Sequence, residues 1–472
     1  MVCRAGVIFP FAFNGALVCF SPMSLPVDTI AALATPVGTS ALAVLRASGP
    51  QAGAIATALC GAPPQPRTAR HGNYRRATGQ LVDDVVFTFF AGPHSYTGED
   101  ALEISCHGSP FIAQVILEDL YSRGCRPAEP GEFTKRAFLN GRMDLSQAEA
   151  VMDVIHARSE RALAAANQQL RGALGRHVQE LVDGLLGVLS HVEAYIDFPE
   201  EDLPAEDRQR LVAEIERLLA GSERLLATHH YGAQLRQGIK TVIIGEPNAG
   251  KSSVLNRLLG RERALVSAFP GTTRDYLEEP AILGSHFVRL VDTAAFNPQA
   301  SDLERRGMDK TVEQCLLADM FLWVLDVAHP CLTLPLQVTE RMAPKNTIVV
   351  INKIDLAPTG SFQPDTRFHF LRVSAANGAG FDELTRLITE LADSSQETVG
   401  NDLIAVNSRH ANALTESIES LRSALRILRN NEFSELLASE LRSSVSSLAS
   451  IVGRFDNERM LDRLFANFCI GK

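Results

Sequence analysis

The sequence lacks the features that mark membrane-spanning, disulfide-stabilised and zinc-binding proteins. No run of about 18 apolar residues occurs, which excludes a membrane-spanning helix. The eight cysteines are scattered and none forms a CxxC pair, so we expect no disulfide framework or zinc site and a reducing, cytoplasmic compartment. The 55 acidic residues outnumber 45 Lys and Arg, for a net charge of −10. A wholly basic surface is therefore excluded, whereas a local basic face that binds nucleic acid is not.

The length of 472 residues is too great for one compact core and predicts two to four domains. Hydrophobic residues make up 46% and charged residues 21%, so the chain is not disordered throughout. Residues 1–27 are a leader of doubtful status, apolar with one Arg and no acid. A signal peptide, a transit peptide and a translation start at Met23 are the three interpretations, and we favour the start at Met23.

The pattern of the remaining chain changes three times. Residues 28–143 mix short apolar runs, such as Val85–Phe90, with turns rich in Pro and Gly, which indicates a small α/β or α+β domain. Residues 144–235 and 389–472 carry apolar side chains at steps of three and four, typical of a helical bundle. Residues 236–388 alternate short apolar strands, rich in Val, Ile and Leu, with helices, which predicts a parallel sheet. The simplest arrangement is an α/β domain inserted into a helical domain.

A phosphate-binding loop is predicted at the start of the insert. Gly245–Ser252 matches GxxxxGK[ST], follows the expected strand Thr241–Ile244 and precedes the expected helix Ser253–Leu259. Backbone N–H groups of such a loop surround phosphate oxygens, and the helix N-terminus adds positive potential. Lys251 is expected to neutralise the β- and γ-phosphates, and the Ser252 hydroxyl to bind magnesium.

Guanine is the expected base. Asn352–Asp355 (NKID) follows the expected strand Ile348–Ile351. The Asp355 carboxylate can accept hydrogen bonds from N1 and N2 of guanine, which adenine does not offer. Ser374 and Ala375 follow the next strand and can complete the base pocket with a backbone N–H.

Two further segments are expected near the phosphates. Asp292 ends the expected strand Val288–Val291 and can reach magnesium through water. Gly271–Asp275 can supply the Thr that binds magnesium in the GTP state. In such proteins the γ-phosphate orders both segments and hydrolysis releases them.

These motifs in this order resemble those of TRAFAC-class GTP-binding proteins. The fuller set, GEPNAGKSS, SAFPGTTRD, DTAA and NKID within a helical domain, resembles the MnmE (TrmE) family of tRNA modification GTPases. That family implies an N-terminal α/β folate-binding domain and a helical bundle interrupted by an inserted Ras-like P-loop G domain. The resemblance covers nearly all of 28–472, with further matching stretches at Asp28–Pro36, Leu45–Pro50, Ser95–Asp100, Cys106–Gly108, Pro130–Asn140, Arg142–Leu145, Asp197–Asp202 and Phe468–Lys472.

The resemblance implies that the N-terminal domain forms the homodimer and binds 5-formyl- or 5,10-methylene-tetrahydrofolate. By matching position, Arg46, Glu103, Arg142 and Lys472 would contact it, with Arg142 standing where the family usually has Lys. A folate offers a glutamate tail to cations and a pterin ring to a carboxylate. The alternative is two surface cations, Arg46 and Arg142, and an exposed strand acid. Cys469 is a candidate reactive thiol, or else a buried structural cysteine.

For the G domain, the resemblance implies potassium in place of an arginine finger. Its ligands would be the Asn248 and Thr272 side chains, the Ser267 hydroxyl and the Phe269 carbonyl, while Ser252 and Thr273 bind Mg²⁺. Glu304 would be the catalytic carboxylate that positions water, or else a helix-surface acid. The GTP contacts would be Asn248, Ala249, Gly250, Lys251, Ser252, Ser253, Ser267, Ala268, Phe269, Pro270, Gly271, Thr272, Thr273, Asp292, Thr293, Ala294, Ala295, Asn352, Lys353, Asp355, Ser374, Ala375 and Ala376.

The chain departs from the family at three positions of the G domain. Ala295 stands where DxxG has Gly, and its Cβ penalises a positive φ. Asn297 replaces the usual Arg, and Ala376 replaces a Lys whose stem covers guanine in many relatives. We expect GTP binding to survive these changes, and rapid turnover to be less certain.

The implied activity is potassium-dependent GTP hydrolysis coupled to the addition of a carboxymethylaminomethyl-type group at C5 of the wobble uridine (U34) of certain tRNAs. The flavoprotein MnmG would be the partner in a heterotetramer, with no membrane involved. The alternatives are a folate-binding scaffold with a decayed GTPase and a ribosome-assembly GTPase. Arg422, Arg426 and Arg429 share a helical face, which could contact tRNA phosphate or the partner, or be a plain solvated face.

Overall fold

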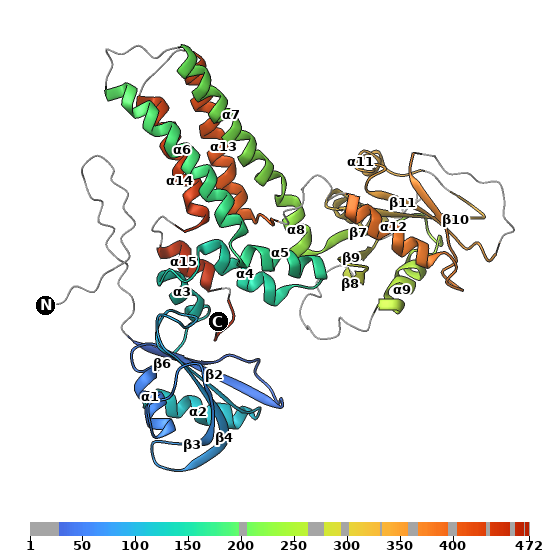
Figure 1. Cartoon of the computed structure of the whole chain (residues 1–472). Helices are drawn as coiled ribbons and strands as arrows, with labels where there is room; N and C mark the ends of the chain where they lie inside the picture. Colours follow the sequence, from blue (N-terminus) through green and yellow to red (C-terminus); the bar gives the residue numbers. More distant parts are fainter. Residues whose placement is uncertain are drawn as a thin grey trace. The chain divides into compact units, whose positions relative to one another are not determined.

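The computed structural model separates into two compact units, Met1–Asp144 with Asp456–Lys472, and Leu145–Phe455 (Figure 1). Among the residues described, no helix is long and apolar enough to cross a membrane. The doubtful leader, residues 1–27, lies outside them. The residues described are 28–197, 205–262, 278–293, 302–330, 333–356, 367–394, 404–430, 435–453, 458–466 and 468–471.

A six-stranded sheet of order β3-β4-β5-β2-β1-β6 forms the centre of the first unit, and all its pairs except β1–β6 are antiparallel. The run Val85–Phe90 lies in β4 and alternates buried side chains with exposed or half-buried ones, so the sheet buries one face of this strand. The elements are β1 (Thr29–Leu33), β2 (Leu42–Ser48), α1 (Ala52–Cys60), β3 (Ala69–Arg75), β4 (Leu81–Phe90), β5 (Ala101–His107), α2 (Pro110–Ser122), β6 (Cys125–Pro127), α3 (Glu132–Leu139) and α15 (Glu458–Phe465).

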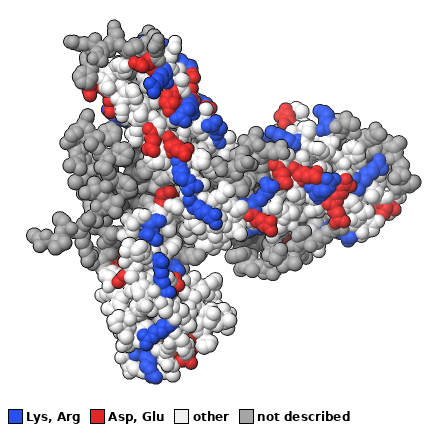
Figure 2. Space-filling model, in the orientation of Figure 1, with Lys and Arg blue, Asp and Glu red and all other residues white. Residues whose placement is uncertain are grey.

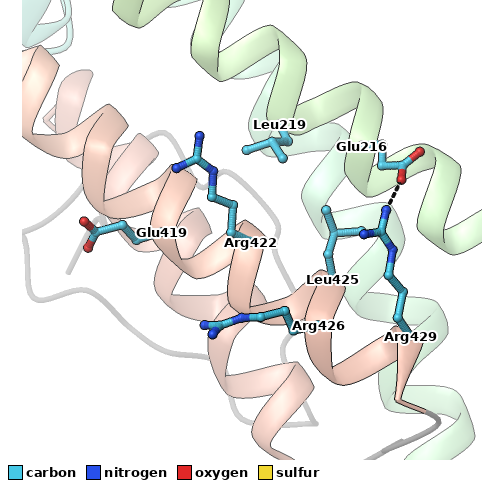
Figure 3. A pocket seen from close by; sticks show the side chains of 7 residues that line it. All are labelled: Glu216, Leu219, Glu419, Arg422, Leu425, Arg426 and Arg429. Carbon is cyan, nitrogen blue, oxygen red and sulfur yellow. Dashed lines mark hydrogen bonds and ion pairs between the residues drawn. The ribbon is translucent and has the colours of Figure 1, made fainter.

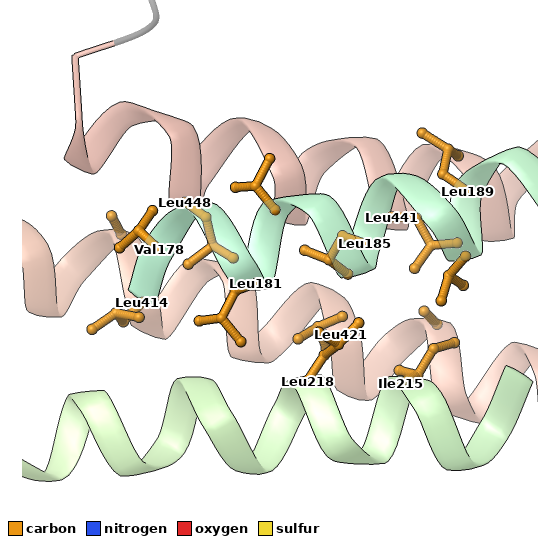
Figure 4. Packing of buried hydrophobic residues seen from close by; sticks show 14 of the residues in the cluster. Val178, Leu181, Leu185, Leu189, Ile215, Leu218, Leu414, Leu421, Leu441 and Leu448 are labelled. Carbon is orange, nitrogen blue, oxygen red and sulfur yellow. The ribbon is translucent and has the colours of Figure 1, made fainter. Parts of the chain in front are cut away.

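The helical part of the second unit joins segments far apart in the sequence. The long helices α6, α7, α13 and α14 pack around one core, in which Leu185, Leu218, Leu421 and Leu441 are almost fully buried (Figure 4). Apolar positions at steps of three and four place these side chains on one face of each helix. The helices are α4 (Leu145–His156), α5 (Glu160–Leu170), α6 (Ala173–Asp197), α7 (Ala205–Ala227), α8 (His229–Gln237), α13 (Ser408–Arg429) and α14 (Glu435–Ile451).

The inserted part is a sheet of order β12-β11-β10-β7-β9-β8, in which only the edge strand β8 runs antiparallel. Every residue of β7 and β11 is buried, as expected of central parallel strands. The predicted fold class, α/β domains with an interrupted helical bundle, is thus confirmed. The elements are β7 (Ile239–Ile244), α9 (Lys251–Glu262), β8 (Glu278–Leu283), β9 (His286–Asp292), α10 (Asp302–Leu316), β10 (Met320–Asp326), α11 (Leu336–Thr339), β11 (Thr347–Asn352), β12 (His369–Arg372) and α12 (Phe381–Ser394).

The chain enters and leaves this insert at neighbouring points. Arg236, near the end of α8, donates a hydrogen bond to the Val406 carbonyl at 2.9 Å. A Cβ at Gly232 would lie 2.5 Å from the same oxygen, so the helix passes very close to the returning segment. Adjacent entry and exit points let a whole domain be inserted without displacing the helices of the bundle.

The C-terminal residues pack on the first unit, whereas the sequence analysis left them with the helical segment 389–472. Lys135 of α3 pairs with Asp462 of α15 at 2.6 Å. The Gly131 N–H donates to the Cys469 carbonyl at 3.3 Å. These contacts bring α15 and Cys469 beside α3, at a position that helical periodicity alone does not specify.

Candidate functional sites

The loop after β7 has a backbone that requires glycine at two positions. Gly245 has φ 151°, and a Cβ there would lie 2.3 Å from the Val324 carbonyl oxygen. Gly250 has φ 92°, and its Cβ would lie 2.3 Å from Asn352 Nδ2. Helix α9 begins directly afterwards at Lys251, so its free N–H groups and those of the loop meet in one place. This is the geometry of an anion site for phosphates.

Lys251 contributes a buried positive charge to this loop. Its ammonium donates to the carbonyls of Gly245 and Glu246, at 3.2 and 3.0 Å. Burial lowers the pKa of Lys251, and the charge of Asp292 opposes that effect. Both hydrogen-bond acceptors are neutral carbonyls, so neither of them forms an ion pair with the ammonium.

The Ser252 hydroxyl and the Asp292 carboxylate form the adjoining corner of the site. Ser252 Oγ donates to Asp292 Oδ2 at 2.5 Å. The other oxygen, Asp292 Oδ1, is buried and has no hydrogen-bond partner within the described parts of the chain. A hydroxyl beside a carboxylate oxygen with a free lone pair suits a hard divalent cation such as Mg²⁺. Thr293, which follows, donates to the Ile243 carbonyl at 2.7 Å and thereby ties this strand end to β7.

The NKID segment connects the phosphate loop to the loop after β12. Asn352 is 2% exposed, its Nδ2 donates to the Ala249 carbonyl at 3.0 Å, and its Oδ1 accepts from the Ala375 N–H at 3.0 Å. Ser374 Oγ donates to Asp355 Oδ1 at 2.5 Å. One buried amide thus positions three loops, and the hydroxyl orients the carboxylate predicted to read the base.

Several predicted site residues lie outside the described residues. These are the potassium and magnesium candidates after α9, the residues following Thr293, and the C-terminal lysine. Glu304 falls in the first turn of α10, but its side chain is not described. The assignments that stay predictions for this reason concern Ser267, Ala268, Phe269, Pro270, Gly271, Thr272, Thr273, Ala294, Ala295, Asn297, Glu304 and Lys472.

A second polar site lies on the sheet of the first unit. Arg46 of β2 is directly opposite Glu103 of β5, and Arg46 Nη2 lies 2.6 Å from Glu103 Oε1. The guanidinium carbon lies 5.5 Å from the Tyr96 ring centroid and 5.7 Å from that of Phe133. Arg46 Nη1 also donates to the Gly471 carbonyl at 3.4 Å. The two predicted folate residues are therefore paired and framed by aromatic rings, unlike isolated surface charges.

Two other residues predicted for this site, Arg142 and Cys469, are exposed at its border. Arg142 is exposed, and a Cβ at Gly98 would lie 3.3 Å from its Cγ. Cys469 is exposed, which removes the alternative of a buried structural thiol. A Cβ at Gly471 would lie 2.4 Å from the Leu33 carbonyl oxygen, so the chain end passes tightly along β1.

The arginine face of α13 forms a shallow groove with α7, and its charges are partly balanced (Figure 3). Arg422 pairs with Glu223 at 2.8 Å, and Arg429 pairs with Glu216. On the side drawn in Figure 2, basic and acidic side chains are interspersed along this part of the chain. A mixed, ion-paired surface supports the interpretation of a solvated face more than a dedicated phosphate-binding surface.

One residue at the nucleotide site was not identified from the sequence. Asp326 ends β10, and its Oδ2 lies 2.8 Å from Lys353 Nζ. The sequence does carry a signal for it. An acidic residue directly follows Phe321–Leu325, the expected strand that precedes Ile348–Ile351 in the chain. Ligand-binding residues of parallel sheets gather at that edge.

Two family models match the chain. The description "MnmE helical domain" covers residues 145–469, and "GTP-binding protein TrmE N-terminus" covers residues 29–142. The tRNA modification GTPase MnmE of Opitutus terrae is 57% identical over 448 residues, covering 94% of this chain and 99% of its own. That of Akkermansia muciniphila is 43% identical over 460 residues, covering 95% and 100%. Among solved structures, the G domain of the Thermotoga maritima FeoB iron transporter is 24% identical, covering 33% of this chain and 98% of its own, with a TM-score of 0.26.

Proposed function

The chain belongs to the MnmE family of tRNA modification GTPases, and from that premise we propose what each of its two polar sites binds. As a member, it is a GTP hydrolase that acts in tRNA modification. The proposal concerns which residues bind GTP, which ions assist hydrolysis, and what the N-terminal unit binds. Its main support is the corner formed by Lys251, Ser252 and Asp292, where a buried charge and an unpartnered carboxylate oxygen adjoin a glycine loop.

GTP binds with its phosphates in the loop Gly245–Ser252 and its base at Asn352–Asp355. Lys251 neutralises the β- and γ-phosphates, and the loop N–H groups bind their oxygens. Asp355, oriented by Ser374, pairs with N1 and N2 of guanine. Ala375 contributes its backbone next to Asn352, and Ala376 lies beside it with a side chain too short to cover the base.

Magnesium would be held by Ser252, by Asp292 through water, and by Thr273. It would supply positive charge to the phosphates, while the protein orients the phosphate and the attacking water. Potassium, held by Asn248, Ser267, Phe269 and Thr272, would supply the charge that an arginine finger supplies elsewhere. Asn248, in the loop after β7, has φ 63°, a left-handed conformation that Asn tolerates better than most residues.

The N-terminal unit binds a tetrahydrofolate that carries the one-carbon group. Arg46 and Glu103 can bind the glutamate tail and the pterin ring of the folate, and Tyr96 and Phe133 offer ring faces for stacking. Arg142 and Lys472 add cations from the surroundings. Cys469 is a candidate thiol in the same segment as Gly471, which contacts Arg46.

The protein works in the cytoplasm as a homodimer, in complex with the flavoprotein MnmG and a tRNA. The homodimer is supported by large apolar side chains exposed on the first unit. Val37 and Leu42 in the β1–β2 region are 88% and 62% exposed, and Phe111 at the start of α2 is 74% exposed. Gly108 donates to the Ala41 carbonyl, which brings these two regions together. Large apolar groups exposed on one unit favour burial against a second copy.

GTP turnover by the full chain in potassium and in sodium tests the catalytic assignment. We expect faster turnover in potassium and a loss of ~10²-fold or more in kcat for Glu304→Ala. Glu313→Ala on the exposed side of α10 is the matched control and should leave kcat unchanged. Equal slow rates in both salts, unmoved by Glu304→Ala, would contradict the assignment.

The alternative, a folate-binding scaffold with a decayed GTPase, predicts a different result in the same assay. If Ala295 blocks the switch, Ala295→Gly restores potassium-stimulated turnover to a chain that otherwise lacks it. The tRNA assignment is tested separately by mass spectrometry of U34 in tRNA from a deletion strain. Unchanged modification there would remove the pathway, whatever the GTPase rate.

A further inference from the structure

The carboxylate of Asp326 contacts two loops, one after β10 and one after β11. Asp326 and Asn352 are register partners at the ends of β10 and β11. One oxygen, Oδ2, lies 2.8 Å from Lys353 Nζ, and the other, Oδ1, accepts from the Ala328 N–H at 2.9 Å. The Val327 N–H donates to the Asn352 carbonyl at 3.1 Å, so β10 and β11 are still hydrogen-bonded to each other at the point where both strands end.

Lys353 has an unusual backbone. Its φ is 66°, and within the described ranges only Arg67 and Asn248 are other non-glycine residues with a positive φ. A side chain with a Cβ disfavours this left-handed conformation, which persists where the surroundings determine it. Here the Leu356 N–H closes a turn on the Lys353 carbonyl at 3.0 Å, and the ion pair with Asp326 holds the other end of the residue.

Lys353 is also the one residue among those proposed to surround the base that can cover a ring face. Asn352 is buried and engaged with two other loops, and Asp355 is directed at the base edge by Ser374. Ala375 and Ala376 have no stem to offer. The four methylene groups of a lysine whose ammonium is fixed can lie flat on an aromatic ring.

We propose that Asp326 is a positioning residue for guanine, which holds the Lys353 ammonium so that the lysine stem covers one face of the base. This deepens the proposed GTP site and rests on it. The Asp326–Lys353 pair is partly exposed, with side chains 20% and 29% accessible, and pairs of this kind add little to folding stability. Its removal therefore affects the nucleotide more than the fold.

Dissociation of a fluorescent GDP analogue from the full chain tests the inference by a double-mutant cycle. The variants are Asp326→Ala, Lys353→Ala and both together, with Asp326→Asn as a version that keeps an acceptor for the Ala328 N–H. We expect each single variant to speed dissociation roughly fivefold or more, and the double variant to match Lys353→Ala alone. In turnover, KM for GTP should rise while kcat is retained.

Base selectivity distinguishes this role from a general disturbance of the pocket. Inosine diphosphate lacks the N2 amino group that Asp355 reads. The ratio of its affinity to that of GDP should stay at the wild-type value in Asp326→Ala, because only the covered face changes.

Additive effects in the cycle, or a lowered melting temperature of the nucleotide-free protein in both Asp326 variants, would overturn the inference. A wild-type chain that fails to bind GDP at all would instead overturn the proposed nucleotide site. The two failures are distinguishable because the first leaves wild-type binding intact.

Discussion

Glu149 of α4 and Arg409 of α13 are 260 positions apart and form a two-pronged ion pair, with Nε–Oε1 at 2.8 Å and Nη2–Oε2 at 3.1 Å. His410 Nε2 lies 2.7 Å from the same carboxylate, and Asn407 donates to it at 2.9 Å. The contact joins the segment before the inserted G domain to the segment after it. Two parallel charge-assisted bonds fix both distance and orientation.

Glu149→Gln should destabilise the helical part by about 3 kcal/mol, because the Arg409 charge is left without its carboxylate in a mostly buried place. The measurement is calorimetry of the full chain. The transition to follow is the one whose melting temperature does not change when GDP is added, because GDP stabilises only the domain that binds it. The matched control is Glu216→Gln, which removes the exposed pair with Arg429 and should cost under about 0.5 kcal/mol. Equal effects of the two variants would contradict the difference in burial.

The same carboxylate predicts how stability depends on pH. Burial raises the pKa of Glu149, but hydrogen bonds and charges from His410 and Arg409 outweigh it and lower the pKa from 4.5 to about 2. A lowered carboxyl pKa stabilises above pH 4.5, and this contribution is lost as pH falls toward 2. Burial also lowers the pKa of His410 below 6.5, so a further loss begins as pH falls below 6.5 and the unfolded histidine takes up a proton. Melting temperatures from pH 7 to 3 should show both losses, and Glu149→Gln should flatten the part below pH 4.5.

Asp355→Asn should exchange the base preference of the nucleotide site. An amide accepts only one N–H but can donate to a carbonyl at position 2, so it suits xanthine better than guanine. We expect GDP affinity to fall ~10²-fold or more and xanthosine diphosphate to bind in its place. Titration of both nucleotides measures the change, with Asp309→Asn on exposed α10 as the control. Retained guanine preference would remove Asp355 from the base site.

Arg46→Ala should weaken binding of 5-formyl-tetrahydrofolate at least ~10-fold, and Arg46→Lys should restore part of it. Lysine keeps the charge but loses the two-pronged geometry and the contacts with the Tyr96 and Phe133 rings. Calorimetric titration measures the affinity, and Arg70→Ala on exposed β3 is the control. Folate binding that is equal in all three variants would show that the ligand lies elsewhere.

Arg161→Ala should loosen the β8–β9 hairpin from α5. Arg161 pairs with Asp393 at 2.7 Å and donates to Ser285 at 3.2 Å, while His286 lies 2.7 Å from the same aspartate. Loss of such charged hydrogen bonds should raise amide exchange in the hairpin roughly tenfold. Arg171→Ala at the exposed end of α5 is the control, and unchanged exchange in the Arg161 variant would mean that Asp393 and His286 suffice.

Several elements were predictable because their signals are local. The strands β7, β9, β10, β11 and β12 fall on the expected short apolar runs, and the expected helix Ser253–Leu259 lies within α9, which begins two residues earlier at Lys251. Strand β8, with sequence EEPAIL, was missed because Pro280 and two glutamates conceal its pattern. It forms a strand because it lies at the edge of the sheet, antiparallel to β9, where the outward-facing backbone N–H and C=O groups need no partner in the sheet.

The sequence by itself determined the phosphate loop and the NKID motif, since each is a run of contiguous residues at a set spacing, and the interrupted bundle, since the helical period appears on both sides of the insert. Only the tertiary structure decided the pairings between distant segments. Arg136, which is 1% exposed, bonds Asp28, Glu99 and Glu132, and Asp326 holds Lys353. Such pairs depend on which strand ends and helices the fold brings together, and a buried charge accepts whichever partner that packing supplies.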